Sequence, residues 1–202
     1  MTERIQHPVV PSPVPEECVL APGDADLLFG GARTAYAFTD ESVTDADLRA
    51  IYELVRPYAD RRILIAKDLI AYFEDVQEFT VAEEVSADTG GATDLVGCGA
   101  LHVMWDDIAE VRTLAVRRDH GIGAALLGEL LERARALSLR RVFCLTFEVD
   151  FFAAHGFRPI QGAPVGMDVF AEMVRSHDDG VAEFLDLARV KPNTLGNSRM
   201  LL

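Results

Sequence analysis

Apolar residues in the first half of the chain recur at helical spacing and indicate two helices. After Thr44 the apolar positions fall three and four residues apart, which places them on one face of a helix: Leu48, Ile51, Tyr52 and Val55. Thr44 followed by Asp47 has the form of a capping box, which predicts that the helix begins at Thr44, and Pro57 is expected to end it. A second helix is predicted over about residues 66–76.

Alternating and continuous apolar runs predict the strands. An edge strand is expected at 34–39, and the strands that follow the two helices lie at 79–83, 95–104 and 109–116. A central amphipathic helix is predicted at 123–137, a buried strand at 141–147, a short helix at 151–155 that Gly156 ends, and a strand at 157–160. Residues 168–187 are predicted to be helical with a break at Gly180, and residues 198–202 to form the last strand. This order of elements indicates an α/β fold.

The centre of the pattern is the run VRTLAVRRDHGIGAALLGELL at residues 111–131, which predicts a strand, a short basic turn and a helix. Backbone N–H groups at the start of a helix lack partners within the helix, so a glycine turn that leads into one can bind an anion. Gly121 and Gly123 would permit a positive φ and close approach of a phosphate. The spacing fits neither a dinucleotide-binding turn nor a P-loop. The turn alone leaves open an anion site and an ordinary strand–turn–helix connection.

Composition and charge narrow the classes of partner. Half of the 202 residues are apolar and the net charge is −14, so neither nucleic acid nor an anionic membrane is expected to bind, because both need clustered Lys and Arg. The three cysteines have neither metal-ligand spacing nor a disulfide framework, and we find no transmembrane run and no secretory signal. A cytoplasmic protein without a metal is therefore expected. Residues 1–33 are Pro-rich and aperiodic, and are expected to be a flexible extension before one domain at residues 34–202.

Several blocks of the sequence carry a family resemblance. They are ILIAK at residues 63–67, QEFTV at 77–81, VGCGAL at 96–101, VFCLT at 142–146 and the tail KPNTLGNSRMLL at 191–202. These blocks resemble the GCN5-related N-acetyltransferase (GNAT) family, and within it the short, stand-alone actinobacterial form of N-acetylglutamate synthase. The resemblance implies the GNAT fold, with a mixed, mostly antiparallel central sheet flanked by helices. It also implies acetyl transfer from acetyl-CoA to the α-amine of glutamate, the first step of arginine biosynthesis.

The same resemblance assigns residues to the cosubstrate acetyl-CoA. Backbone N–H groups of Leu114, Ala115 and Val116 would hold the thioester carbonyl, which is an oxyanion-type contact. The pyrophosphate would lie on the basic turn and the first residues of the helix after it: Arg118, His120, Gly121, Ile122, Gly123 and Ala124. The loop before Gly121 is shorter than is usual in the family, so the turn would offer fewer N–H donors.

Catalysis would need a base, because an α-ammonium group is not a nucleophile. Glu110 is the first candidate, since it lies just ahead of the residues that would face the acetyl group; the alternative is a solvated carboxylate at a strand edge. Glu148 is a second candidate acid or base, or else a carboxylate at the start of the short helix. The position where the family often carries a tyrosine as general acid is Phe152 here, so the thiolate would leave without that residue.

Glutamate carries two carboxylates, so its pocket should offer two cations or equivalent donors. By resemblance Lys67, Ser198 and Arg199 match substrate-contacting positions. Arg112 lies two residues after Glu110 on the same strand and therefore on the same face. Each of these residues alone could instead be an ordinary surface residue or ion-pair member.

Two other functions remain open at this stage. The same chemistry could act on glutamine, another amino acid or a protein N-terminus. The short turn and the missing tyrosine also fit a module that binds acetyl-CoA or senses arginine without turnover. A homodimer is possible for either.

Overall fold

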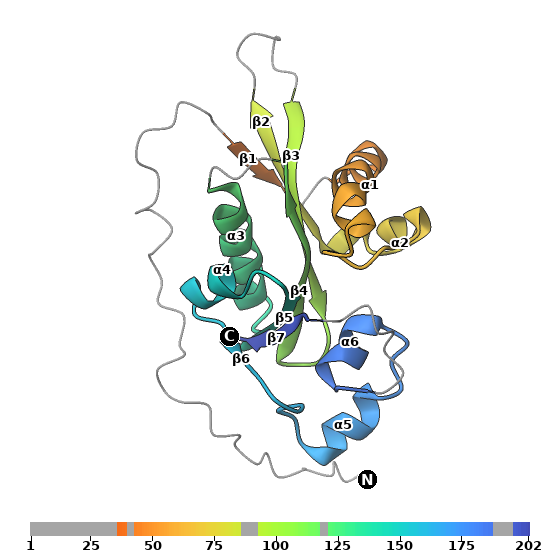
Figure 1. Ribbon diagram of the computed structural model, residues 1–202, viewed down its shortest axis with the longest axis vertical. Helices are drawn as coiled ribbons and strands as arrows, with labels where there is room; N and C mark the ends of the chain where they lie inside the picture. The colour runs from red at the N-terminus through yellow and green to blue at the C-terminus, as the bar shows by residue number, and fades with distance from the viewer. Residues whose placement is uncertain (1–35, 40–42, 86–92, 118–120, 188–195) are drawn as a thin grey trace, which may run out of the picture.

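The computed structural model describes residues 36–39, 43–85, 93–117, 121–187 and 196–202. Its centre is a seven-stranded sheet in the order β1-β2-β3-β4-β5-β7-β6 (Figure 1). The strands are β1 (Tyr36–Thr39), β2 (Phe79–Val85), β3 (Thr93–Val103), β4 (Ile108–Val116), β5 (Arg141–Thr146), β6 (Arg158–Pro159) and β7 (Ser198–Leu201). Only β4 and β5 pair in parallel, and every other neighbouring pair is antiparallel. The expected mixed, mostly antiparallel sheet is therefore confirmed.

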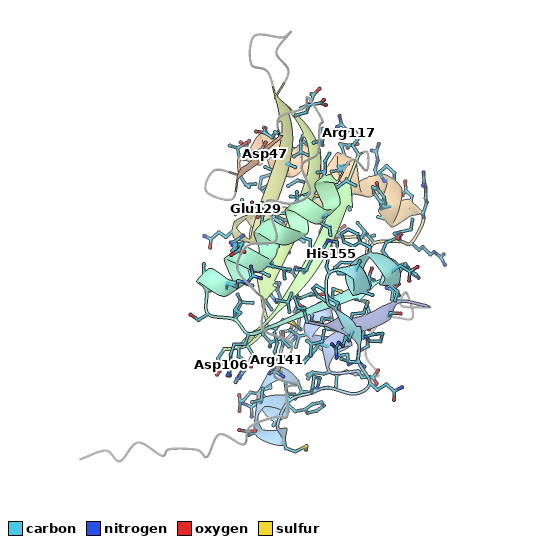
Figure 2. All side chains as sticks on the ribbon, turned by 90° about the vertical axis from the view of Figure 1, so that its left-hand side faces the viewer. Asp47, Asp106, Arg117, Glu129, Arg141 and His155 are labelled. Carbon is cyan, nitrogen blue, oxygen red and sulfur yellow. The ribbon has the colours of Figure 1, made fainter. Side chains whose placement is uncertain are left out.

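Helices cover both faces of this sheet. α1 (Asp45–Asp60), α2 (Leu69–Glu74), α5 (Met167–Met173) and α6 (Asp179–Phe184) lie on one face, and α3 (Ile122–Ala136) and α4 (Val149–Ala154) lie on the other (Figure 1). A short 3-10 helix, η2 (Val76–Glu78), leads from α2 into β2. Figure 2, turned by 90°, shows α3 along the sheet, with the exposed Glu129 labelled on it. A sheet that helices cover on both sides buries both of its faces, which explains the apolar runs of β4 and β5.

Alternation along β4 divides the core. Ala109 and Val111 pack with the buried leucines of α3, whereas Ile108 packs with Phe143 and Phe184 on the face of α6. Because successive strand residues point to opposite faces, Glu110 and Arg112 belong to the face of Ile108, which is the face of α1, α2 and α6. The period of the strand thus places both polar candidates on one side of the sheet.

An irregularity in β4 separates its second half from β5. The pairing of β4 with β5 ends at Val111 and Cys144, although β4 continues to Val116. The register between β3 and β4 shifts opposite the same stretch, where Thr113 has a φ of 57°. A β-branched residue with a positive φ is strained, and such strain is found at functional sites. Leu114, Ala115 and Val116 therefore lie where the two strands have ceased to pair.

The capping box at Thr44 is confirmed, but Pro57 does not end the helix. The Thr44 N–H donates to Asp47 Oδ2 at 2.7 Å, and the Asp47 N–H donates to Thr44 Oγ1 at 3.3 Å. α1 continues past Pro57 to Asp60. The Tyr58 hydroxyl donates to the Val116 carbonyl at 2.6 Å, so a tertiary contact holds the turn that follows the proline.

Two further boundaries differ from the prediction. α2 spans only Leu69–Glu74, and its last part is the 3-10 helix η2. The expected break at Gly180 is wrong: residues 174–178 separate α5 from α6, and Gly180 lies inside α6, whose first turn Asp178 caps through the Val181 N–H. The proposed extension at residues 1–33 and the first two residues of the domain at residues 34–202 lie outside the described residues.

Candidate functional site

Glu110 lies in the middle of the sheet and is almost enclosed. It pairs with His102 on β3 and with Phe143 on β5, and only 5% of its surface is exposed. Burial raises its pKa to about 7, against the opposing effects of nearby cations, of which Arg112 is the strongest. A carboxyl group of this pKa can accept and release a proton near neutral pH. The burial contradicts the alternative of a solvated carboxylate, and the role of Glu110 as a base stays a prediction.

The first turn of α6 closes over this carboxylate. A Cβ at Gly180 would collide with Glu110 Oε2, so only glycine allows the two elements to approach this closely. Among the described residues Glu110 Oε2 has no hydrogen-bond partner. An unpaired buried carboxylate oxygen is costly, and such cost is typical of a group that a ligand engages.

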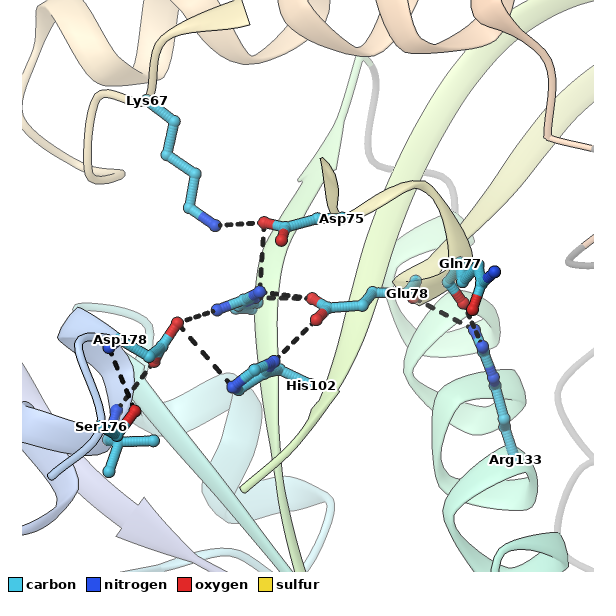
Figure 3. Close-up of polar contacts among 10 residues, drawn as sticks. Lys67, Asp75, Gln77, Glu78, His102, Arg133, Ser176 and Asp178 are labelled. Atoms are coloured by element: carbon cyan, nitrogen blue, oxygen red, sulfur yellow. Dashed lines mark hydrogen bonds and ion pairs between the residues drawn. The ribbon is translucent and has the colours of Figure 1, made fainter. Parts of the chain in front are cut away.

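Arg112 lies beside Glu110 at the centre of an ion network. Its guanidinium donates from Nε to Glu78 Oε2 at 2.9 Å and from Nη1 to Asp178 Oδ2 at 2.8 Å, and Nη2 lies 3.1 Å from Asp75 Oδ2. Lys67 Nζ donates to the same Asp75 oxygen at 3.0 Å (Figure 3). The structure thus brings Lys67 and Arg112 together, as a carboxylate pocket requires, but each already pairs with carboxylates of the chain itself.

His102 extends the network toward Glu110. Its Nδ1 lies 2.6 Å from Glu78 Oε1 and its Nε2 lies 3.8 Å from Asp178 Oδ2 (Figure 3). Burial would lower the pKa of His102, but the hydrogen bond to Glu78 together with the negative charges of Glu78 and Asp178 outweighs it and raises that pKa above its usual value. His102 is not among the candidates that the sequence suggested, and the register of β3 against β4 sets it opposite Glu110.

The acidic partners in this network are the residues that the sequence did not suggest. Burial would raise the pKa of Asp178, but the Val181 N–H and Arg112 outweigh it and hold that pKa below its ordinary range. Arg133 of α3 donates to the backbone carbonyls of Gln77 and Glu78, which fixes η2 and the Glu78 side chain from the far side of the sheet. The block QEFTV at residues 77–81 was part of the family resemblance, but it did not indicate that Glu78 pairs with Arg112 and His102.

The glycine turn has the geometry of an anion site at its helical end. Gly121 is the N-cap of α3 with a φ of 83°, in the left-handed region that favours glycine. Ile122 and Gly123 are buried in the first turn of α3 and Ala124 is half-buried. The start of this 15-residue helix carries a partial positive charge. Arg118 and His120, and with them the shortened part of the loop, lie outside the described residues.

The other sequence candidates lie apart from this network. Arg199 on β7 donates to the carbonyls of Gly162, at 2.9 Å, and Phe184, and Ser198 next to it pairs with Thr146 of β5. Within the described part of the chain, no hydrogen bond or ion pair joins either residue to Lys67 or Arg112. Their role in substrate binding stays a prediction.

Glu148 is the N-cap of α4, and Phe152 lies inside this helix. Glu148 is exposed at the N-cap, and its backbone N–H donates to Thr146 Oγ1 at 2.8 Å. Phe152 is buried against Phe157 and Phe151 and therefore serves the core. The exposure of Glu148 favours the helix-start interpretation over an acid or base role.

The described residues also bear on metal binding, membrane-spanning helices and the role of the cysteines. Within the ranges that the structure describes, no group of His, Cys, Asp and Glu could hold a metal ion, and no helix is long and apolar enough to cross a membrane. Cys98 and Cys144 are buried and free, as expected for packing residues, and burial raises the pKa of the Cys98 thiol to about 12.

The buried carboxyl predicts an effect on stability. We expect Glu110→Gln to raise the free energy of unfolding above neutral pH by up to about 3 kcal/mol. Because the folded-state pKa is raised from 4.5 to about 7, ionisation of Glu110 destabilises the fold as pH rises through that interval. Urea denaturation at about pH 5 and about pH 8 tests this, with Glu129→Gln as the exposed control. An equal gain at both pH values would trace the effect to packing and not to charge.

Comparisons with known proteins identify the family of the chain. Residues 46–157 match the sequence model of the acetyltransferase (GNAT) family. An amino-acid acetyltransferase from Mycobacterium tuberculosis is 57% identical over 160 residues, which cover 78% of this chain and 89% of the relative.

Two solved structures have the same fold. Rv2747 from Mycobacterium tuberculosis, in complex with CoA and NLQ, aligns with a TM-score of 0.74 at 54% identity over 82% of this chain and 98% of its own. N-acetylglutamate synthase from Neisseria gonorrhoeae, complexed with coenzyme A and N-acetyl-glutamate, aligns with a TM-score of 0.61 at 21% identity over 83% of this chain and 34% of its own, which shows the fold alone. By its sequence and its fold, the chain belongs to the GNAT family of acetyltransferases.

Proposed function

We propose that the chain is an amino-acid N-acetyltransferase that transfers acetyl from acetyl-CoA to the α-amine of glutamate. The observation that carries the proposal is the buried Glu110, with a pKa of about 7, beside the cations Arg112 and Lys67. A base next to carboxylate-binding groups suits an amine that carries carboxylates. The relative from Mycobacterium tuberculosis that is an amino-acid acetyltransferase supports the same acceptor class.

Glu110 would act as the general base. Its carboxylate takes a proton from the α-ammonium group, and the free amine then attacks the thioester carbon of acetyl-CoA. The C–N bond forms as the C–S bond breaks, and the electron pair of the C–S bond leaves on the CoA thiolate. The second proton of the attacking nitrogen passes to that thiolate or to water, which leaves the neutral amide. Phe152 offers no proton, so the thiolate leaves as such, as its ordinary pKa near 8–9 permits, or takes a proton from water.

The unpaired end of β4 would hold the thioester. Leu114, Ala115 and Val116 lie beyond the last residue of β4 that pairs with β5. Their backbone N–H groups could therefore donate hydrogen bonds to the thioester carbonyl oxygen of acetyl-CoA. Gly121 and the start of α3 lie at the C-terminal end of this stretch and fit a pyrophosphate. The related Rv2747 structure, 54% identical, contains CoA and supports CoA as the ligand of this fold.

A second acceptor is favoured by the charge of the pocket. The two cations face three carboxylates, those of Asp75, Glu78 and Asp178. In this alternative the surplus of negative charge would oppose a second carboxylate on the substrate, and the neutral amide of glutamine would be preferred to glutamate.

Thiol release from acetyl-CoA in the presence of each of the twenty amino acids tests both candidates. We expect the highest kcat/KM with glutamate, and a higher value with glutamine would replace it by the second candidate. If none of the twenty amino acids supported thiol release, the proposed function would be contradicted. If calorimetry then showed acetyl-CoA binding, the chain would be a binding module without turnover.

A further inference from the structure

One oxygen of the proposed base is covered in the conformation that the structure describes. Glu110 is 5% exposed, and the first turn of α6 lies on its Oε2 at Gly180. A proton passes from an ammonium group to a carboxylate oxygen across a hydrogen bond, either directly or through one water. Movement of the first turn of α6 away from Glu110 would therefore give the amine direct access to Oε2.

Asp178 connects this turn to the substrate cations. One of its oxygens, Oδ1, accepts the Val181 N–H at 2.9 Å and caps α6, while the other, Oδ2, accepts from Arg112 Nη1 at 2.8 Å. Arg112 keeps a second anchor, because its Nε and Nη2 bond Glu78. The Nη1 edge of Arg112 can thus change partner without loss of the position of its guanidinium.

We propose that Asp178 is a specificity-determining residue that a carboxylate of the amino-acid substrate displaces from Arg112, and that this exchange releases the first turn of α6 from Glu110. The inference rests on the proposed function, since it takes Arg112 as the site of a substrate carboxylate. An amine without a carboxylate would then meet a covered base.

The energetics suit such an exchange. Removing a partner from the largely buried guanidinium of Arg112 is costly, but replacing one carboxylate by another leaves the number of charge-assisted hydrogen bonds unchanged. α6 is only six residues long, and Val181 in its first turn and Phe184 are buried in the core. The movement must therefore be a small pivot about these two anchors, which shifts Asp178 and Gly180 more than the core.

The test compares Asp178→Asn with Asp179→Asn on three acceptors: glutamate, glutamine and the α-amide of glutamine. The side-chain oxygen of Asn can still cap α6, so the fold should persist. Asp179 is exposed on the same turn, and its replacement removes the same charge one residue away. Glutamine and its α-amide differ only in the α-carboxylate, whereas glutamate and glutamine differ only in the side-chain carboxylate.

For Asp178→Asn we expect KM to fall by about tenfold for the acceptors that carry the exchanging carboxylate, and kcat to rise for the α-amide, whose base is no longer covered. Asp179→Asn should change neither value. A lower KM for both glutamate and glutamine would identify the α-carboxylate as the group that displaces Asp178. A lower KM for glutamate alone would identify the side-chain carboxylate. Lower kcat for all three acceptors with unchanged KM values would overturn the proposal, because Asp178 would then only hold Arg112 in place.

Gly180→Ala provides a second, independent variant. The added Cβ pushes the first turn of α6 off Glu110 and leaves the Asp178 carboxylate intact. For Gly180→Ala we expect a higher kcat for the α-amide than in the wild type, but not the fall in KM for glutamine that is expected for Asp178→Asn. If the ratios of kcat/KM among the three acceptors stayed as in the wild type, the proposal would be overturned. If the wild type acetylates no amino acid, the proposed function fails. Calorimetry then tests the exchange by itself, with glutamine and its α-amide each titrated into the wild type and into Asp178→Asn. Equal affinities of the two proteins for each ligand would exclude the exchange.

Discussion

Replacing Glu110 by Gln is expected to lower kcat by about 10²-fold, while KM for acetyl-CoA stays the same. Gln is nearly isosteric and fills the same enclosed space between β3, β5 and α6, but it cannot take a proton from the amine. Steady-state thiol release at saturating acetyl-CoA measures the effect.

The pH profile gives this experiment a second readout. Because burial raises the pKa of Glu110 to about 7, the base is protonated at lower pH, and wild-type kcat/KM should fall as pH drops through about 7. That limb should vanish in Glu110→Gln. Glu148→Gln is the matched control, since Glu148 is exposed at the start of α4. A normal kcat with the acidic limb retained would remove Glu110 from the mechanism.

Arg112→Ala is expected both to weaken binding of the amino acid and to destabilise the fold. Loss of a charge-assisted contact to a substrate carboxylate should raise KM at least tenfold, and acetyl-CoA binding should be unaffected. The side chain of Arg112 is only 10% exposed, and its removal leaves Asp75, Glu78 and Asp178 without their shared cation. Because these carboxylates are partly solvated, we expect a loss of about 2–3 kcal/mol, below the value for a fully buried pair.

The destabilisation should also depend on pH. The pKa of Asp178 is lowered in the folded protein, so its pairing stabilises the fold above the ordinary Asp pKa and is lost as pH falls through the folded-state value. The difference between wild type and Arg112→Ala in urea denaturation should therefore narrow in acid. Arg175→Ala, which removes an exposed pair with Glu172, should cost at most about 1 kcal/mol. A similar loss for both variants would show that the network adds no stability of its own.

Local signals in the sequence were sufficient for most elements and for one side of the site. The two-residue period of β4 put Glu110 and Arg112 on the same face, because alternation along a strand needs no tertiary information. The capping box at Thr44 and the left-handed φ of Gly121 follow from equally local chemistry, since a side chain or a missing Cβ within a few residues decides them. The resemblance to the GNAT family added the mixed, mostly antiparallel sheet and the class of reaction.

Only the tertiary structure decided how the site is completed. Lys67, Glu78, His102 and Asp178 come from four separate elements, and no sequence spacing relates them. The register of β3 against β4 sets His102 opposite Glu110, and the contact of α6 with the sheet makes Gly180 a position where a side chain would collide. Helix α1 likewise continues past Pro57 with Tyr58 bonded to β4. These features depend on which distant surfaces pack together, and packing of distant segments is the information that a one-dimensional pattern does not contain.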